Sequence, residues 1–195
     1  MEGFRTLFFH KQIRKIIYIL LIVGIIYLFM YEMLVDLLLV ATGGTAMQIS
    51  MSLVLAILAN VFIVRLSPWL KNKIGNLKVF VVLAGVYGLL MLIALRVNFL
   101  MAVALMIFWA IVYSLSLIIQ SDILNKYISS KYRATSLSTF NLLINLPYVF
   151  MASMFGWLAD LYSVQKVIVV LGVVLLGGLV ISVVNFLIEV GKRRR

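Results

Sequence analysis

Six long apolar segments constrain the fold of this chain more than any other feature. Short stretches with turn-forming or charged residues, such as TGGT and DLYSVQK, separate them. Each segment is close to the roughly 20 residues that an α-helix needs to cross the hydrocarbon core of a bilayer. Backbone groups in lipid must be satisfied within the protein, so an all-α integral membrane protein is predicted. The predicted spans are residues 16–40, 47–66, 79–95, 99–120, 137–158 and 167–188.

Composition excludes several classes of protein. The 195 residues are 65% hydrophobic and 12% charged, whereas soluble domains have roughly 45–50% apolar and about 25% charged residues. The chain has no cysteine and a single histidine, His10. Thiolate, haem and zinc sites are therefore not expected, and no metal or cofactor is predicted. The net charge of +11 lies in short clusters between the apolar segments, which argues against nucleic acid as a partner.

The basic residues predict the orientation of the spans. Fifteen of the 17 Lys and Arg residues lie in the arm over residues 1–15, in the connections after the second and fourth spans, and in the tail over residues 190–195. With six spans, all four regions fall on one side, and only Arg96 and Lys166 fall on the other. The positive-inside rule then places both termini in the cytoplasm of a multi-pass protein of the cell (plasma or inner) membrane. Membrane lipid is the expected partner of these clusters, and the amphipathic arm is expected to lie in the interface.

Polar and aromatic side chains recur at helical spacing in the first, second, fourth and fifth spans. The third and sixth spans are nearly all aliphatic and are expected to face lipid. The order polar, polar, apolar therefore occurs twice, which predicts a 3+3 inverted repeat around a polar cavity. For any single stripe, hydrogen bonding between helices or aromatic anchoring at the interface is an equally good explanation. The residues predicted to line a substrate pathway are Tyr27, Tyr31, Glu32, Trp109, Tyr113, Ser116, Gln120, Asn141, Asn145 and Tyr148.

Two carboxylates, Glu32 and Asp36, lie one turn apart in the first span, with no basic residue near them in sequence. The helix rise places Asp36 near the external rim, where water can reach it, and Glu32 in the outer third of the hydrocarbon. An ionisable residue at that depth is a functional hypothesis, so Glu32 is a candidate for proton coupling or for attracting cationic cargo. An intramembrane aspartyl enzyme is not expected, because its paired acids must converge from different helices, whereas these two share one.

Small residues and one proline suggest how the helices pack. Pro147 cannot donate a hydrogen bond to the Leu143 carbonyl and is predicted to kink the fifth span. Asn145 or nearby hydroxyls are candidates to satisfy that carbonyl. Pairs of small residues spaced four apart are expected to allow close approach between helices. These pairs are Ala84 and Gly88, Ala152 and Gly156, and Gly178 and Ser182.

Two stretches resemble the major facilitator superfamily of transporters. The stretch YRATSLSTFNLLINLPYVFMASMFGWLADLYS, residues 132–163, resembles the penultimate-helix region of that family, in which Arg-Ala-Thr follows a cytoplasmic loop and the helix ends in G-x-L-A-D. The stretch PWLKNKIGNLK, residues 68–78, resembles a degraded copy of the cytoplasmic loop motif of the family. Pro68 and Asn72 stand where the motif has Gly and Asp. The cytoplasmic loop or gate residues that this resemblance implies are Lys73, Gly75, Lys78 and Arg133.

The resemblance covers nearly the whole chain, as the C-terminal six-helix half of such a transporter. It implies that the first and fourth helices line a central cavity, that the second and fifth form gates, and that the third and sixth face lipid. Two halves are needed for transport. The chain is therefore expected to be a fragment of a twelve-helix protein, or to pair with an N-terminal half or with a second copy of itself.

The expected function is secondary active transport of a small-molecule substrate by alternating access, without enzymatic activity. Aromatic and amide groups with few cations suit amphipathic or weakly polar cargo, which favours an efflux or drug-export type, with the proton as a candidate coupling ion. The alternative is a membrane scaffold or partner subunit that does not transport.

Overall fold

A computed structural model of the chain describes residues 11–65, 67–128 and 130–193. These residues form an all-helical bundle in which six helical runs are long and apolar enough to cross a membrane. The predicted all-α fold, with six helices of the length and hydropathy of membrane spans, is thus confirmed. The runs are α2 (Lys11–Phe29) with η1 (Met30–Leu34) and α3 (Val35–Ala41), α4 (Ala46–Val64), α6 (Asn76–Leu92) with η2 (Ile93–Arg96), α7 (Phe99–Tyr127), α8 (Arg133–Tyr162) and α9 (Val164–Arg193).

Each predicted span overlaps one of these runs, but several helices extend beyond the apolar segments. α7 continues to Tyr127 and α8 begins at Arg133, with η3 (Ser130–Tyr132) before it. The loop between the second and third spans holds a further short helix, α5 (Ser67–Ile74). Hydropathy marks only the part of a helix at lipid depth, whereas backbone hydrogen bonding continues into water.

The two predicted terminal segments have different outcomes. Most of the basic arm over residues 1–15 lies outside the described residues, and its last five residues begin α2. α9 continues to Arg193, so the tail predicted from residue 190 begins as helix, and its last two residues are outside the described part.

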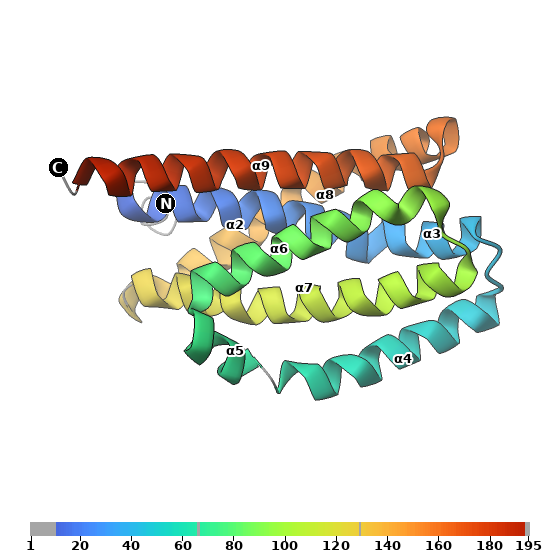
Figure 1. Ribbon diagram of the computed structural model, residues 1–195, viewed down its shortest axis with the longest axis horizontal. Coiled ribbons are helices and arrows are strands. Elements are labelled where there is room, and N and C mark those ends of the chain that lie inside the picture. Colours follow the sequence, from blue (N-terminus) through green and yellow to red (C-terminus); the bar gives the residue numbers. More distant parts are fainter. Residues whose placement is uncertain (1–10, 66, 129, 194–195) are drawn as a thin grey trace.

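The helices contact one another in a defined set of pairs. α2 packs against α8 and α9, α7 packs against α4 and α6, and α6 and α9 pack along each other. Figure 1 shows that the start of α2, the end of α9 and the short helix α5 all lie at the same end of the bundle. We call this the basic end, and the opposite one the distal end. The described basic residues of the loops there are Arg65, Lys71, Lys73, Lys78, Lys126, Lys131 and Arg133.

The first span is interrupted by a π-helical turn, η1, over MYEML. The amide of Val35 donates to the carbonyl of Met30, five residues earlier, instead of four. Such turns are rare and occur frequently at functional sites. Glu32 lies inside this turn.

Glycines set the closest approach between α6 and α9. A Cβ atom at Gly172 would lie 2.8 Å from the Cβ of Met91 and 3.2 Å from the carbonyl oxygen of Gly88. One at Gly88 would lie 2.9 Å from Cγ of Leu176. The predicted small-residue pair containing Gly88 therefore does lie at a close contact. The other two do not: nothing lies within 4 Å of a Cβ at Gly156, and one at Gly178 would make an ordinary 3.6 Å contact.

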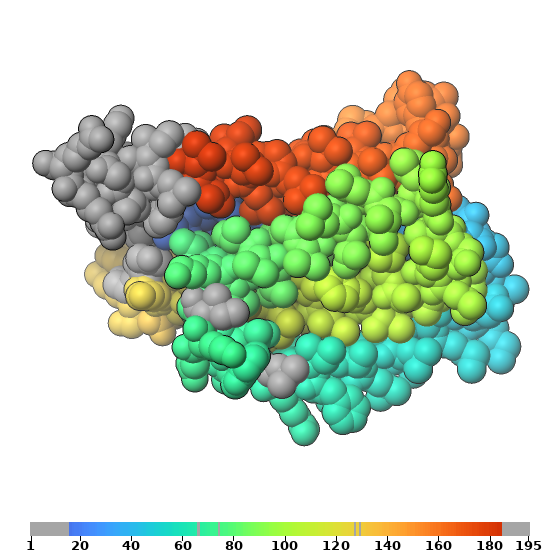
Figure 2. Space-filling view, in the orientation of Figure 1, coloured from blue at the N-terminus to red at the C-terminus, as the bar shows by residue number. Residues whose placement is uncertain are grey.

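The distribution of burial shows that the aliphatic spans also pack within the bundle. In the most apolar stretch of each helix, 11% of the α4 residues and 6% of the α8 residues are buried, against 39% for α6 and 33% for α9. Figure 2 shows α9, α6, α7 and α4 following one another across one face. The third and sixth spans therefore each bury a face within the bundle. An aliphatic side chain suits lipid and a packed helix equally, so composition could not separate the two.

Candidate functional site

A groove of about 290 Å³ lies between the first span, α4, α6 and α7. Asn60 lies toward the basic end of the groove and Asp36 toward its distal end. At the rise of an α-helix, Asn60 is roughly 6 Å before the end of α4 and Asp36 roughly 8 Å before the end of α3, so the groove occupies the middle part of the bundle. Its lining combines two carboxylates, one amide, three aromatic rings and aliphatic side chains. The lining residues are Tyr31, Glu32, Val35, Asp36, Leu53, Ala56, Ile57, Asn60, Tyr87, Met106, Trp109 and Ala110.

Both carboxylates of the first span face this groove. Glu32 is on the π-helical turn and Asp36 is in the first turn of α3; both side chains are exposed. No Lys, Arg or His is among the residues that line the groove. Glu32 was predicted to line a pathway, whereas Asp36 was expected to be only a rim residue. The structure brings both to the same groove.

Aromatic rings form a continuous cluster at the groove and beneath it. The ring centroids of Tyr27 and Tyr87 are 4.1 Å apart, and those of Tyr87 and Trp109 are 5.9 Å apart. Tyr113 stacks on Tyr31 at 4.6 Å and meets Tyr27 edge-on at 6.3 Å. The predicted stripe of Tyr27 and Tyr31 therefore packs against the predicted stripe of α7. Tyr27, Tyr87 and Trp109 are all fully buried.

A small internal cavity of about 20 Å³ lies on the other side of this cluster. Its polar lining comes from Tyr27, Tyr113, Ser116 and Gln120, four of the predicted pathway residues. Its volume is close to that of one water molecule. The buried amide of Gln120 donates to the carbonyl oxygen of Leu20 at 2.9 Å and so connects α7 to α2.

Replacing Gln120 with leucine should lower the free energy of unfolding by about 0.6–2 kcal/mol, the range of hydrogen bonds between helices in membranes. The change removes the bond to Leu20 but keeps a side chain of similar size. Unfolding in mixed micelles with a denaturing detergent, followed by circular dichroism, measures the difference. Thr139→Val is the matched control, because within the described part of the chain the Thr139 hydroxyl donates to the Thr135 carbonyl of its own helix and to no other helix. Equal stabilities of the two variants would contradict a role for Gln120 in joining α7 to α2.

Two buried polar atoms near the groove have no hydrogen-bond partner among the described residues. They are Nε1 of Trp109 and Oδ1 of Asn60. Both residues line the groove. A buried polar group without a partner is unfavourable and calls for an explanation, such as a water or ligand that completes its hydrogen bond.

The predicted pathway residues of α8 lie elsewhere. Asn141 and Asn145 are exposed, and the Asn145 amide donates to the Asn141 carbonyl at 2.8 Å, not to the Leu143 carbonyl as was suggested. Tyr148 is half-buried, with its ring 5.4 Å from that of Phe29. Pro147 is inside α8 as predicted. None of these residues lines the groove, because α8 packs mainly against α2 and α9, whereas the groove lies between the first span, α4, α6 and α7.

The predicted loop residues lie at the basic end, at the helix boundaries. Gly75 precedes α6 with φ of 89°, a value that favours glycine, and Lys78 is exposed in the first turn of α6. Lys73 is exposed on α5, with its ammonium 5.0 Å from the centre of the Trp69 ring. Arg133 is exposed at the start of α8.

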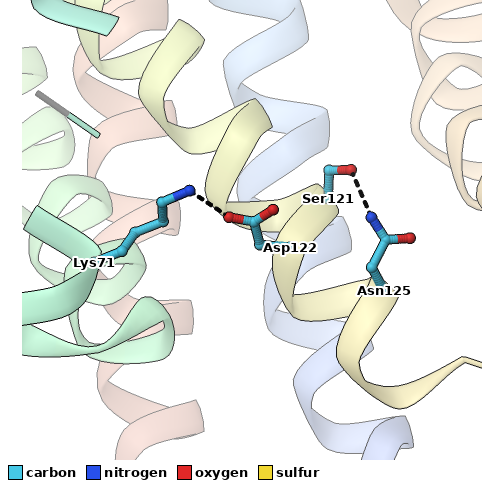
Figure 3. A network of polar contacts seen from close by, with 4 residues as sticks. All are labelled: Lys71, Ser121, Asp122 and Asn125. Carbon is cyan, nitrogen blue, oxygen red and sulfur yellow. Dashed lines mark hydrogen bonds and ion pairs between the residues drawn. The ribbon is translucent and has the colours of Figure 1, made fainter. Parts of the chain in front are cut away.

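A different lysine makes the contact between this loop and the bundle. The Lys71 ammonium and an Asp122 carboxylate oxygen are 2.6 Å apart, which ties α5 to α7 (Figure 3). Close by, the Asn125 amide donates to the Ser121 hydroxyl at 3.4 Å (Figure 3). Lys71 lies in the motif stretch, but its partner is 51 residues away, so only the tertiary structure identifies the pair.

Sequence reasoning missed three of the polar and aromatic groove residues: Tyr87, Asn60 and Asp36. Tyr87 is the one tyrosine in an aliphatic span that was expected to face lipid. It could have been found as the exception to its segment. Asn60 is a single amide near the end of the second predicted span.

Comparison of the chain with protein-family models, with curated proteins and with solved structures found no match. The resemblance to the major facilitator superfamily rests on the sequence stretches at residues 68–78 and 132–163.

Proposed function

We propose that the protein is one six-helix half of a secondary transporter of the major facilitator type, which moves a small amphipathic solute by alternating access. One observation supports this most directly. A groove at mid-depth is lined by two carboxylates and by buried aromatic residues from different spans, including Glu32 and Trp109. Ionisable residues inside a membrane bundle are rare and generally mark a solute or ion pathway.

The helix contacts support the 3+3 repeat. A 3+3 repeat would make the first span equivalent to α7, α4 equivalent to α8, and α6 equivalent to α9. The α2–α8 and α2–α9 contacts then correspond to the α7–α4 and α7–α6 contacts, which are also present. The α6–α9 contact maps onto itself. Two equivalent three-helix units, packed around a local two-fold axis, would produce these five pairs, whereas the α8–α9 contact has no comparable α4–α6 counterpart.

The exposed faces of α4 and α8 support a second half as partner. These two spans are the least buried, and Asn141 and Asn145 lie exposed in the middle of α8. Amide groups are unfavourable against lipid tails and are commonly found at contacts between helices. An N-terminal half or a second copy of this chain would cover them.

The basic end is proposed to face the cytoplasm, in the cell membrane, by the positive-inside rule. The aromatic cluster around Tyr27 and Tyr87 separates the groove from the small cavity around Ser116. In alternating access, rocking of one half against the other would open and close such a barrier around a central site. The aromatic and acidic lining, without a basic group, favours export of amphipathic cargo.

The test is accumulation of fluorescent cationic, neutral and anionic amphiphiles in cells with and without the intact gene. We expect lower accumulation of at least one dye when the gene is present. Glu32→Gln and Trp109→Ala should each reduce this difference about tenfold, equivalent to roughly 1.4 kcal/mol. Asp160→Asn and Trp69→Ala are the matched controls, because both side chains are exposed and neither lines the groove.

Equal accumulation of every dye with and without the gene would contradict transport. Together with a fixed partner in purification, that result would favour a scaffold or partner subunit. Normal transport by Glu32→Gln and Trp109→Ala would show that the groove is not the pathway.

A further inference from the structure

We propose that the groove binds an organic cation, namely a protonated amine that carries a compact aromatic body. This rests on the proposed function, because it names the class of solute that the transporter would carry. It concerns equilibrium binding at one site, which can be measured without transport.

The charge of the groove selects a cation. Glu32 and Asp36 both line it, and no basic residue does. The ammonium of Lys71, at the basic end, is engaged with Asp122 and does not line the groove. Carboxylates at the edge of a low-dielectric bundle attract a cation more strongly than they would in bulk water. An anionic solute would meet two like charges and no compensating group.

The aromatic wall suits a flat, apolar body attached to the charge. Tyr31, Tyr87 and Trp109 line the same groove as the carboxylates. Cations bind over aromatic faces, with tryptophan the best partner, and aromatic bodies stack on the same surfaces. The volume of about 290 Å³ is at the lower end of the range for small-molecule sites, so a small solute is expected.

The two unpartnered atoms are independent evidence for a ligand. Trp109 is only 1% exposed, yet its indole N–H has no acceptor among the described residues. Asn60 is another residue of the groove lining, and its buried Oδ1 has no donor among the described residues. An ammonium N–H matches the Asn60 oxygen, which favours a protonated amine over a quaternary one. A water or an acceptor atom of the solute would complete the Trp109 bond.

The site can be tested with two probes that differ in charge: 1-naphthylmethylammonium and the neutral 1-naphthylmethanol. The purified 195-residue chain is placed in nanodiscs of zwitterionic lipid, so that the lipid surface does not attract the cation. Equilibrium dialysis at fixed ionic strength measures both affinities, with empty nanodiscs to correct for partition. We expect the cation to bind about tenfold or more tightly than the alcohol, equivalent to roughly 1.4 kcal/mol.

Variants identify the source of this preference. The double variant Glu32→Gln, Asp36→Asn should bind the two probes with similar affinity, and each single variant should lose part of the preference. Asp160→Asn is the control, because it removes one carboxylate from the chain, as each single variant does. It should retain the full preference for the cation, since Asp160 is exposed at the end of α8. Tyr31→Ala should weaken both probes, because Tyr31 is the exposed ring of the groove lining on which each can stack.

Three results would overturn the proposal: no binding of the cation, equal affinity for both probes, or a preference that survives in the double variant. These differ from failure of the transporter itself. Cation binding with the expected variant effects, but equal dye accumulation with and without the gene, would leave the site standing and refute transport. Gene-dependent export of a neutral or anionic dye, without cation binding, would keep the transporter and refute this site.

Discussion

Replacing Gly172 with alanine is expected to lower the free energy of unfolding by about 1–3 kcal/mol, the usual range for overpacking a close contact. The new methyl group would lie 2.8 Å from the Cβ of Met91 and 3.2 Å from the carbonyl oxygen of Gly88. Neither neighbour is the end of a flexible side chain, so α6 and α9 must move apart. Leucine at the same position should have a larger effect, because more of its side chain must be accommodated.

Gly177 and Gly85 supply the controls on the same two helices. A Cβ atom at either position meets nothing within 4 Å. Alanine there should leave stability unchanged or raise it slightly, since alanine favours helix over glycine by up to about 1 kcal/mol. Denaturing-detergent titration of the four variants gives the comparison. If Gly172→Ala were as stable as Gly177→Ala, α6 and α9 would not approach as closely as described.

Replacing Tyr87 with alanine should remove the barrier between the groove and the small cavity. The ring is fully buried, 4.1 Å from that of Tyr27 and 5.9 Å from that of Trp109. Truncating such an aromatic side chain destabilises proteins by about 3–5 kcal/mol, through lost contacts and the cavity that remains. Tyr87→Phe keeps the ring and should retain most of the stability.

The opening can be measured separately from the stability. The chain has no cysteine, so Ser116→Cys introduces a single thiol beside the small cavity. We expect a membrane-impermeant thiol reagent to label this thiol slowly when residue 87 is tyrosine or phenylalanine. Labelling should be faster in the chain that carries Tyr87→Ala. Equal labelling in all three, in variants that remain helical, would mean that Tyr87 does not separate the two spaces.

Periodicity predicted correctly which of these side chains lie together on one face. Tyr27 and Tyr31 were expected on one helical stripe, and both rings meet Tyr113 of α7. Ser116 and Gln120 were expected on the same face as Tyr113, and all three line one cavity. A 3.6-residue period decides which side chains of a helix share a face, and it does so before any packing forms.

The same reasoning could not decide what each face contacts. Asn141 and Asn145 form an equally clear stripe, yet they are exposed and do not line the groove. Tyr87 belongs to an aliphatic span and is at the centre of the aromatic cluster. Gly172, in the sixth span, was not identified as a packing residue, although it makes a closer contact than the predicted Gly156 and Gly178. Relative rotation and distance between helices are needed in each case.

The sequence by itself determined that the chain forms six spans, which side chains share a helical face, and that the basic residues gather at one end. Each of these follows from local properties, namely the transfer of backbone and side chains into lipid and the geometry of one helix. Only the tertiary structure decided that Glu32 and Asp36 meet Asn60 and Trp109 in a groove, and that α6 packs on α9. Lipid tails and helix neighbours are equally apolar, so hydropathy cannot distinguish them, and shape complementarity selects the partner.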